Sequence, residues 1–255
     1  MTNILRFPLL VLALSVVALW LSVRIGVSFR KRRRSLEENE REDFGIIMAA
    51  ILTLLGLIIG FSFSMAITRY DQRKNLEETE ANAIGTEYVR ADLLPAADAP
   101  RVRALLENYL DQRVLFYKTR DDRQLGQIDS ATAQLETGLW SAVQAPAAAQ
   151  PTPIVTIAVT GMNDVLNSKG YTQAAWLNRI PIAAWGLMTA IAICCNLLIG
   201  YGARGGEART MLLLVLPLIV SISFCLIADI DSPRGGIVRV RPQNLISLSQ
   251  SLHKR

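Results

Sequence analysis

The chain has 255 residues, of which 51% are hydrophobic and 7% aromatic, with a net charge of +5 and a mean hydropathy of +0.29. It also contains five consecutive basic residues at 30–34, so its apolar and charged residues must be segregated into blocks, which is typical of a membrane protein. Residues 68–178 carry 11 Lys and Arg against 14 Asp and Glu, a net charge of −3, and the rest of the chain has a net charge of +8. Because the basic excess lies beside the apolar blocks, nucleic acid is disfavoured as a partner.

Four apolar stretches predict membrane-spanning helices, at residues 7–29, 44–67, 180–201 and 210–228. The second carries no charged residue and would be about 36 Å long as a helix, more than the roughly 30 Å of a hydrocarbon core. The first precedes the basic cluster instead of following it, which argues against a cleaved signal peptide. The sequence therefore predicts an all-α protein in which residues 1–67 and 179–229 each hold two transmembrane helices.

The polar region 68–178 is predicted to be an extramembrane helical domain between spans two and three. Span two runs on without a helix breaker to Pro95, and further helices are expected from Pro100 to about Tyr117, after Asp122, and over 154–168. The composition of residues 145–153, rich in Ala and Pro, predicts a linker. The acidic residues along the first of these helices are expected to form a solvated face: Glu77, Glu78, Glu80, Glu87 and Asp92.

Orientation follows from the basic residues near the spans. One basic residue precedes the first span, Arg6, and five follow it directly, at 30–34. The first helix usually dominates topology, and a long connection can cross the membrane regardless of its charge. We therefore expect both termini and the helical domain outside the cytoplasm, which in a bacterium is the periplasmic side of the inner (plasma) membrane.

Span two carries small residues on one helical face: Thr53, Gly56, Gly60 and Ser64. One interpretation is close helix packing within or between subunits. The other is that these residues line a narrow conduit, with Phe61 and Phe63 forming an apolar constriction, because such constrictions can gate by dewetting.

The ends of spans two and four must emerge on the same membrane face. Arg69, Asp71 and Arg73 should therefore lie beside Asp229 and Asp231 at the membrane boundary. We expect ion pairs there between either arginine and either of the two carboxylates at the end of span four. The tail, residues 230–255, then turns at Pro233, Arg234, Gly235 and Gly236. A short amphipathic helix with Leu245, Leu248 and Leu252 on its apolar side is expected to pack on the helical domain.

Three runs of sequence resemble a bacterial family of bestrophin-like membrane proteins: residues 60–74, 80–95 and the pair of motifs at 231–236 and 239–242. The resemblance extends over residues 40–252. It implies a pentameric channel for small anions, with span two lining the pore and a helical domain grown from spans two and three. In bestrophins that domain is cytoplasmic, the opposite of the side that the basic residues indicate here. No acidic calcium-binding run is found in this sequence.

We find no nucleophile–base pair, metal-binding cluster or phosphate-binding loop in the sequence, so neither an enzyme nor a cofactor is expected. Cys194, Cys195 and Cys225 lie in apolar stretches and are expected to act as small hydrophobes. Two hypotheses remain. The first is a homo-oligomeric channel in the lipid bilayer that conducts small anions through a pore lined by span two. The second is a non-conducting envelope protein whose helical domain is an interaction or structural module.

Overall fold

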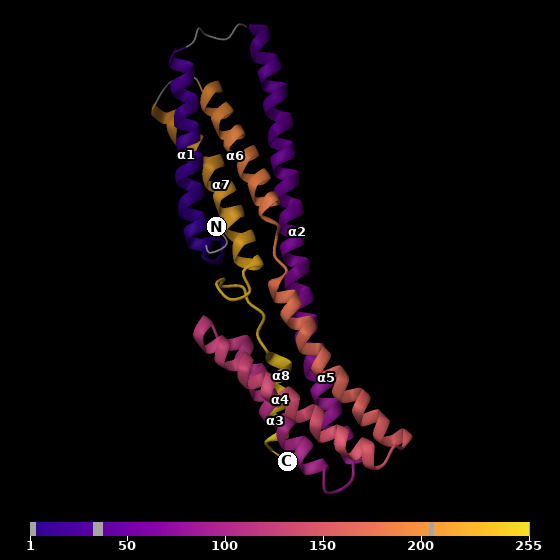
Figure 1. Cartoon of the computed structure of the whole chain (residues 1–255). Coiled ribbons are helices and arrows are strands. Elements are labelled where there is room, and N and C mark those ends of the chain that lie inside the picture. The colour runs from indigo at the N-terminus through magenta and orange to yellow at the C-terminus, as the bar shows by residue number, and fades with distance from the viewer. Residues whose placement is uncertain (1–3, 33–37, 204–206, 255) are drawn as a thin grey trace. The chain divides into compact units, whose positions relative to one another are not determined.

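A computed structural model describes residues 4–32, 38–203 and 207–254, and every regular element in these ranges is a helix (Figure 1). Arg33, Arg34 and Arg204, three of the basic residues that predict the orientation, lie outside the described residues. The chain divides into two compact units. The membrane unit comprises residues 1–69 and 179–239, and the helical unit comprises residues 70–178 and 240–255.

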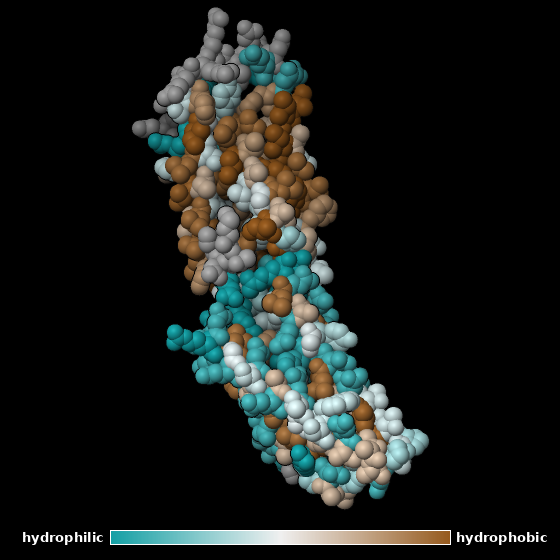
Figure 2. All heavy atoms as spheres, viewed as in Figure 1, coloured by the Kyte–Doolittle hydropathy of each residue, from teal (hydrophilic) through white to brown (hydrophobic). Residues whose placement is uncertain are grey.

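The membrane unit contains the four apolar stretches. Its elements are η1 (Ile4–Arg6), α1 (Pro8–Arg32), the first part of α2 (Glu38–Arg90), α6 (Ile182–Gly202) and α7 (Glu207–Asp231). Four helices in the described residues are long and apolar enough to cross a membrane, which confirms the predicted all-α fold with four spans. Large apolar side chains such as Leu9 and Leu218 are exposed on this unit, and its visible face is predominantly hydrophobic (Figure 2). Such a surface is stable in lipid rather than in water.

Two glycines bring α1 and α6 into direct backbone contact. A Cβ added to Gly26 would overlap the carbonyl oxygen of Leu197, and one added to Gly200 would overlap the carbonyl oxygen of Val23. Small residues at a crossing allow helix backbones to approach closely in a membrane. At the same end of the pair, the guanidinium of Arg30 donates to the carbonyls of Gly202 and Ala203, which have no partner within the helix.

The helical unit packs five helices around a single apolar core. They are the second part of α2, α3 (Ala99–Lys118), α4 (Asp122–Ala149), α5 (Pro153–Leu177) and α8 (Gln243–Leu252), and the short η2 (Ala91–Leu93) follows α2. Fully buried side chains from all five of these helices meet in the core, among them Ile84, Leu110, Leu139, Met162 and Leu245. Leu245 and Leu252 fix the apolar side of α8 in this core.

The predicted linker at residues 145–153 is wrong. The helix α4 continues through Pro146 to Ala149, because alanine favours helix and Pro146 is itself buried. Only residues 150–152 separate it from α5, where the Thr152 hydroxyl caps the helix by accepting from the amide of Val155 at 3.3 Å. The helix predicted over 154–168 instead runs past Gly170 to Leu177. No atom outside the helix lies within 4 Å of a Cβ placed at Gly170, so nothing there requires the helix to end.

The contact between α1 and α6 predicts that alanine substitutions at two glycines of α6 have different effects on stability. We expect Gly200→Ala to lower the stability of the detergent-solubilised protein by about 1–3 kcal/mol, because the added methyl group must push two backbones apart. Gly186→Ala is the control, since a Cβ at Gly186 meets open space. Thermal unfolding of both variants checks this. Equal melting temperatures for the two would contradict the close approach of α1 and α6.

Candidate functional site

One face of α2 is bare in a single copy of the chain. Thr53, Gly56, Gly60 and Ser64 recur at spacings of three or four and are all exposed. A Cβ added to Gly56 or Gly60 meets no described atom within 4 Å. These glycines therefore contact no other helix among the described residues of one copy, and packing between copies and the conduit both remain predictions. The face is available to other copies of the chain or to a conduit.

The two phenylalanines lie on opposite flanks of this face. Phe61 is exposed and Phe63 is half-buried. Residues two apart on a helix are separated by about 200°, so both rings cannot point along the direction of Gly60. The predicted constriction remains a prediction, and in this geometry it would be made by one of the two rings from each copy.

Polar residues continue the same face beyond the apolar stretch. Asp71, Asn75, Glu78 and Asn82 keep the spacing of three or four that begins at Thr53, and each is exposed. Lys74 is also exposed, toward the edge of this set. Among the helices of the described residues, α2 alone contributes to both units, so this polar continuation belongs to the same element as the small residues.

The opposite face of α2 in the helical unit is buried although it is charged. Arg73, Glu77, Glu80 and Glu87, spaced by four, three and seven residues, have at most 1% of their surface exposed. The expectation of a solvated acidic face is therefore wrong for Glu77, Glu80 and Glu87, while Glu78 and Asp92 are exposed as expected. A buried carboxylate needs partners or must keep its proton, and the three buried carboxylates differ in which of these applies.

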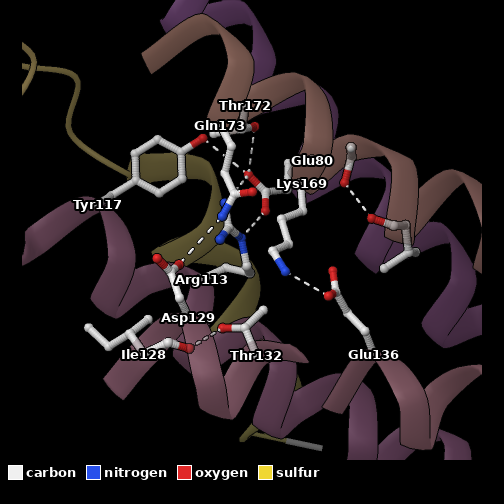
Figure 3. A network of polar contacts seen from close by, with 12 residues as sticks. Glu80, Arg113, Tyr117, Ile128, Asp129, Thr132, Glu136, Lys169, Thr172 and Gln173 are labelled. Atoms are coloured by element: carbon white, nitrogen blue, oxygen red, sulfur yellow. Dashed lines mark hydrogen bonds and ion pairs between the residues drawn. The ribbon is translucent and has the colours of Figure 1, made fainter. Parts of the chain in front are cut away.

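Glu80 joins three helices (Figure 3). Its carboxylate pairs with the guanidinium of Arg113 on α3, and both side chains are completely buried. Its Oε2 atom also accepts from the Tyr117 hydroxyl of α3 and the Thr172 hydroxyl of α5, each at 3.1 Å. Burial raises the pKa of Tyr117, so this hydroxyl keeps its proton and donates. The Arg113 guanidinium lies 4.4 Å from the centroid of the Phe116 ring, which adds a cation–π contact.

Further polar pairs surround this network and join α5 to α4. Lys169 donates to Glu136 at 2.6 Å, and Gln173 donates to Asp129 at 3.4 Å (Figure 3). Removing one partner from a buried ion pair is strongly destabilising, because it leaves the other charge uncompensated. The Glu80–Arg113 pair therefore fixes the rotation of α2 within the helical unit.

Glu77 attaches the carboxy-terminal helix to α2. Its carboxylate accepts from the side-chain amide of Asn244 at 2.7 Å and from the backbone amide of Leu245 at 3.0 Å. The amides in the first turn of a helix have no intrahelical acceptor, so a carboxylate placed there stabilises the helix end. The first turn of α8 is thus attached to the buried face of α2, the same face that Arg113 of α3 contacts.

The side chain of Glu87 packs directly against the backbone of α5 at a glycine. A Cβ on Gly161 of α5 would overlap Oε2 of Glu87 and lie 2.6 Å from Nη1 of Arg90. Neither carboxylate oxygen has a hydrogen-bond partner among the described residues. Burial raises the pKa of Glu87 to about 8, against the opposing effect of Arg90 and with a smaller contribution from Asp164. Glu87 is therefore mostly protonated at neutral pH.

At the end of α7, two carboxylates organise the tail turn and the start of α6. Asp229 accepts from the backbone amides of Ile237 at 2.7 Å and Val238 at 2.8 Å. Asp231 accepts from the amide of Ile180 at 3.1 and 3.2 Å, one distance for each oxygen. A Cβ on Gly236 would overlap the Asp229 carbonyl oxygen, so the turn requires glycine there. The ion pairs of Arg69 or Arg73 with these carboxylates remain a prediction.

Residues 9–245 match the family model of the bestrophin-like domain. The chain therefore belongs to the bestrophin-like family and is a membrane protein. This confirms the resemblance seen in the motifs at 60–74, 80–95 and 231–242. Among curated proteins, none matches this sequence.

Solved structures show the same fold at low sequence identity. A crystal structure of a bacterial bestrophin homologue from Klebsiella pneumoniae is 13% identical to this chain, with a TM-score of 0.67, over 96% of this chain and 97% of that one. A point variant of that homologue is 14% identical, with a TM-score of 0.66, over 97% of this chain and 98% of that one. At these identities the likeness shows the fold and not the permeant ion.

The buried position of Glu87 predicts a dependence of stability on pH. Because the pKa of this carboxyl rises from 4.5 to about 8 on folding, its contribution to stability is fully present below pH 4.5 and is lost as the pH rises to about 8. We expect Glu87→Gln to remove this part of the decline in melting temperature between pH 6 and pH 8.5, a change of a few °C. Glu78→Gln is the control, since Glu78 is exposed. A decline of the same size in the wild type and in Glu87→Gln would show that Glu87 does not keep its proton.

Proposed function

We propose that several copies of this chain assemble with their α2 helices around a common axis and form an ion channel. The exposed face of Thr53, Gly56, Gly60 and Ser64 carries this proposal, because a four-helix copy has no room for a pore among its own helices. Small residues permit a narrow conduit, and backbone and hydroxyl oxygens supply polar groups in it. The Thr53 hydroxyl donates to the carbonyl of Ala49 at 2.8 Å, so its oxygen remains able to accept from water in a conduit.

Membership of the family supports the same assignment. The channel architecture that the resemblance implies has span two lining the pore, and α2 is the helix that contributes to both units of this chain. Glu80, Glu77 and Glu87 hold the opposite face of α2 inside the helical unit. These contacts keep the exposed polar continuation of α2 outside the core of the helical unit.

The features of this chain point to two different permeant ions, an anion and a cation. The resemblance implies a small anion. The exposed polar continuation of α2 carries Asp71 and Glu78 against one cation, Lys74, and rings of carboxylates favour cations in pores. A gradient of KCl across the membrane separates the two, because the reversal potential takes opposite signs for the two ions.

The pore is testable with protein reconstituted in liposomes. We expect wild-type protein to pass an ion flux, and Gly60→Leu to reduce it at least tenfold, because a leucine from every copy would fill the conduit. Gly186→Leu is the matched control, an exposed glycine of α6 with open space around it. Asp71→Asn combined with Glu78→Gln is expected to shift the reversal potential toward anions.

Absence of flux from folded, oligomeric wild-type protein would contradict the channel and leave the non-conducting envelope protein as the better hypothesis. Equal loss in Gly60→Leu and Gly186→Leu would contradict the assignment of α2 as the lining helix.

The orientation is a separate prediction. We propose that the helical unit lies in the periplasm, as the basic residues around the first span indicate. A cysteine at Gln124, which is exposed at the start of α4, is expected to react with a membrane-impermeant maleimide in cells with a permeabilised outer membrane. Cys194, Cys195 and Cys225 are replaced by alanine in that experiment. Protection of this cysteine until the inner membrane is opened would place the unit in the cytoplasm, the side it takes in bestrophins.

A further inference from the structure

An apolar groove of about 470 Å³ lies in the membrane unit, between the start of α1, the end of α7 and the tail. Its walls include Phe7, Leu9 and Leu12 from one side, Ile222 and Leu226 from another, and Ile237 from the tail. These side chains are accessible in a single copy, with Leu9 72% and Ile237 86% exposed. The groove is thus an apolar surface that only an apolar partner can cover favourably.

The carboxylate of Asp229, which lines the groove, already accepts hydrogen bonds from the backbone. Asp229 contributes to the lining, and it accepts from the amides of Ile237 and Val238. The rest of the lining consists of apolar side chains, one thiol at Cys225 and a glycine at 235. A peptide or a chain of water molecules would find few hydrogen-bond partners there, whereas a hydrocarbon chain needs none.

The groove lies where lipid is the surrounding solvent. It extends along the first turns of span one and the last two turns of span four, from Ile222 to Asp229, which corresponds to about 10–12 Å of helix. It therefore opens into the outer part of the hydrocarbon layer, next to the boundary at which lipid headgroups begin.

Basic residues lie at the boundary end of the groove. Arg6 is exposed and directly precedes Phe7, and its carbonyl oxygen packs against Gly235, the neighbour of Arg234. Arg179 is close enough to Arg6 for the two guanidinium groups to repel each other, an effect that Asp231 offsets. Arginine binds phosphate through parallel hydrogen bonds, so this end of the groove is complementary to a phosphate.

From these contacts we infer that the groove binds one acyl chain of an anionic phospholipid, whose phosphate lies against Arg6 and Arg234. The lipid would join the start of α1 to the tail turn and so brace the end of α7. This inference does not depend on whether the protein conducts ions.

The inference is tested with full-length protein in liposomes that contain phosphatidylglycerol with a diazirine on its acyl chain. After irradiation, we expect the crosslinks mapped by mass spectrometry to concentrate on residues 222–226 and 235–238. Cys225→Phe, which fills the groove, is expected to reduce this labelling at least fivefold. Leu218→Phe, on the same helix and exposed outside the groove, is the control and is expected to leave it unchanged.

A second variant keeps the groove and changes the charge. The double substitution Arg6→Gln and Arg234→Gln is expected to abolish the preference for the phosphatidylglycerol probe over the same probe with a phosphatidylcholine headgroup, which carries no net charge. Labelling spread evenly along α7 and unaffected by Cys225→Phe would overturn the groove as a lipid site. Crosslinks from the groove to a second copy in place of lipid would also overturn it, and they would assign the groove to the oligomer interface.

Discussion

The ion pair of Glu80 and Arg113 is the contact on which the arrangement of α2 depends. Transferring two charges out of water costs several kcal/mol per ion, and only close pairing with additional hydrogen bonds offsets this cost. Here Tyr117 and Thr172 supply those bonds, so a single carboxylate ties α2 to α3 and α5. Rotating α2 by even one residue would break all of these interactions at once. The pair therefore sets the rotation of this helix more strictly than apolar packing would, because apolar side chains tolerate small shifts.

A fixed rotation has a consequence on the other side of the same helix. Arg73, Glu77, Glu80 and Glu87 occupy the buried face, so the residues about 180° away must remain outside the core of one copy. Those residues are Asp71, Asn75, Glu78 and Asn82, and in the apolar stretch of α2 the same spacing leads back to Ser64, Gly60 and Thr53. Because α2 is continuous from Glu38 to Arg90, the small residues and the polar residues lie along one face of the same helix.

Much of this architecture follows from the sequence. The four apolar stretches are long and carry a single charged residue, Arg24 near the end of the first, and this predicts the spans. The motifs at 60–74 and 231–242 indicate the family. The buried carboxylates could not be predicted, because a charged residue is normally placed on the solvated face and the partner of Glu80 lies 33 residues away. The signal in the sequence was the spacing of Glu77, Glu80 and Glu87 by three and seven residues, on the same helical face as the apolar Ile84. The extension of α4 through Pro146 was missed because proline is read as a helix breaker.

We propose that the face of α2 with Thr53, Gly60 and Ser64 surrounds an aqueous conduit. Single cysteines at these positions and at Leu54 and Met65, in a background without Cys194, Cys195 and Cys225, test it most directly. All five positions are exposed in one copy of the chain. In membranes, a water-soluble thiosulfonate is predicted to modify cysteines at 53, 60 and 64 and to leave those at 54 and 65 unmodified, since the latter face lipid or a neighbouring helix. Protection of all five cysteines, or modification only at 54 and 65, would contradict the account.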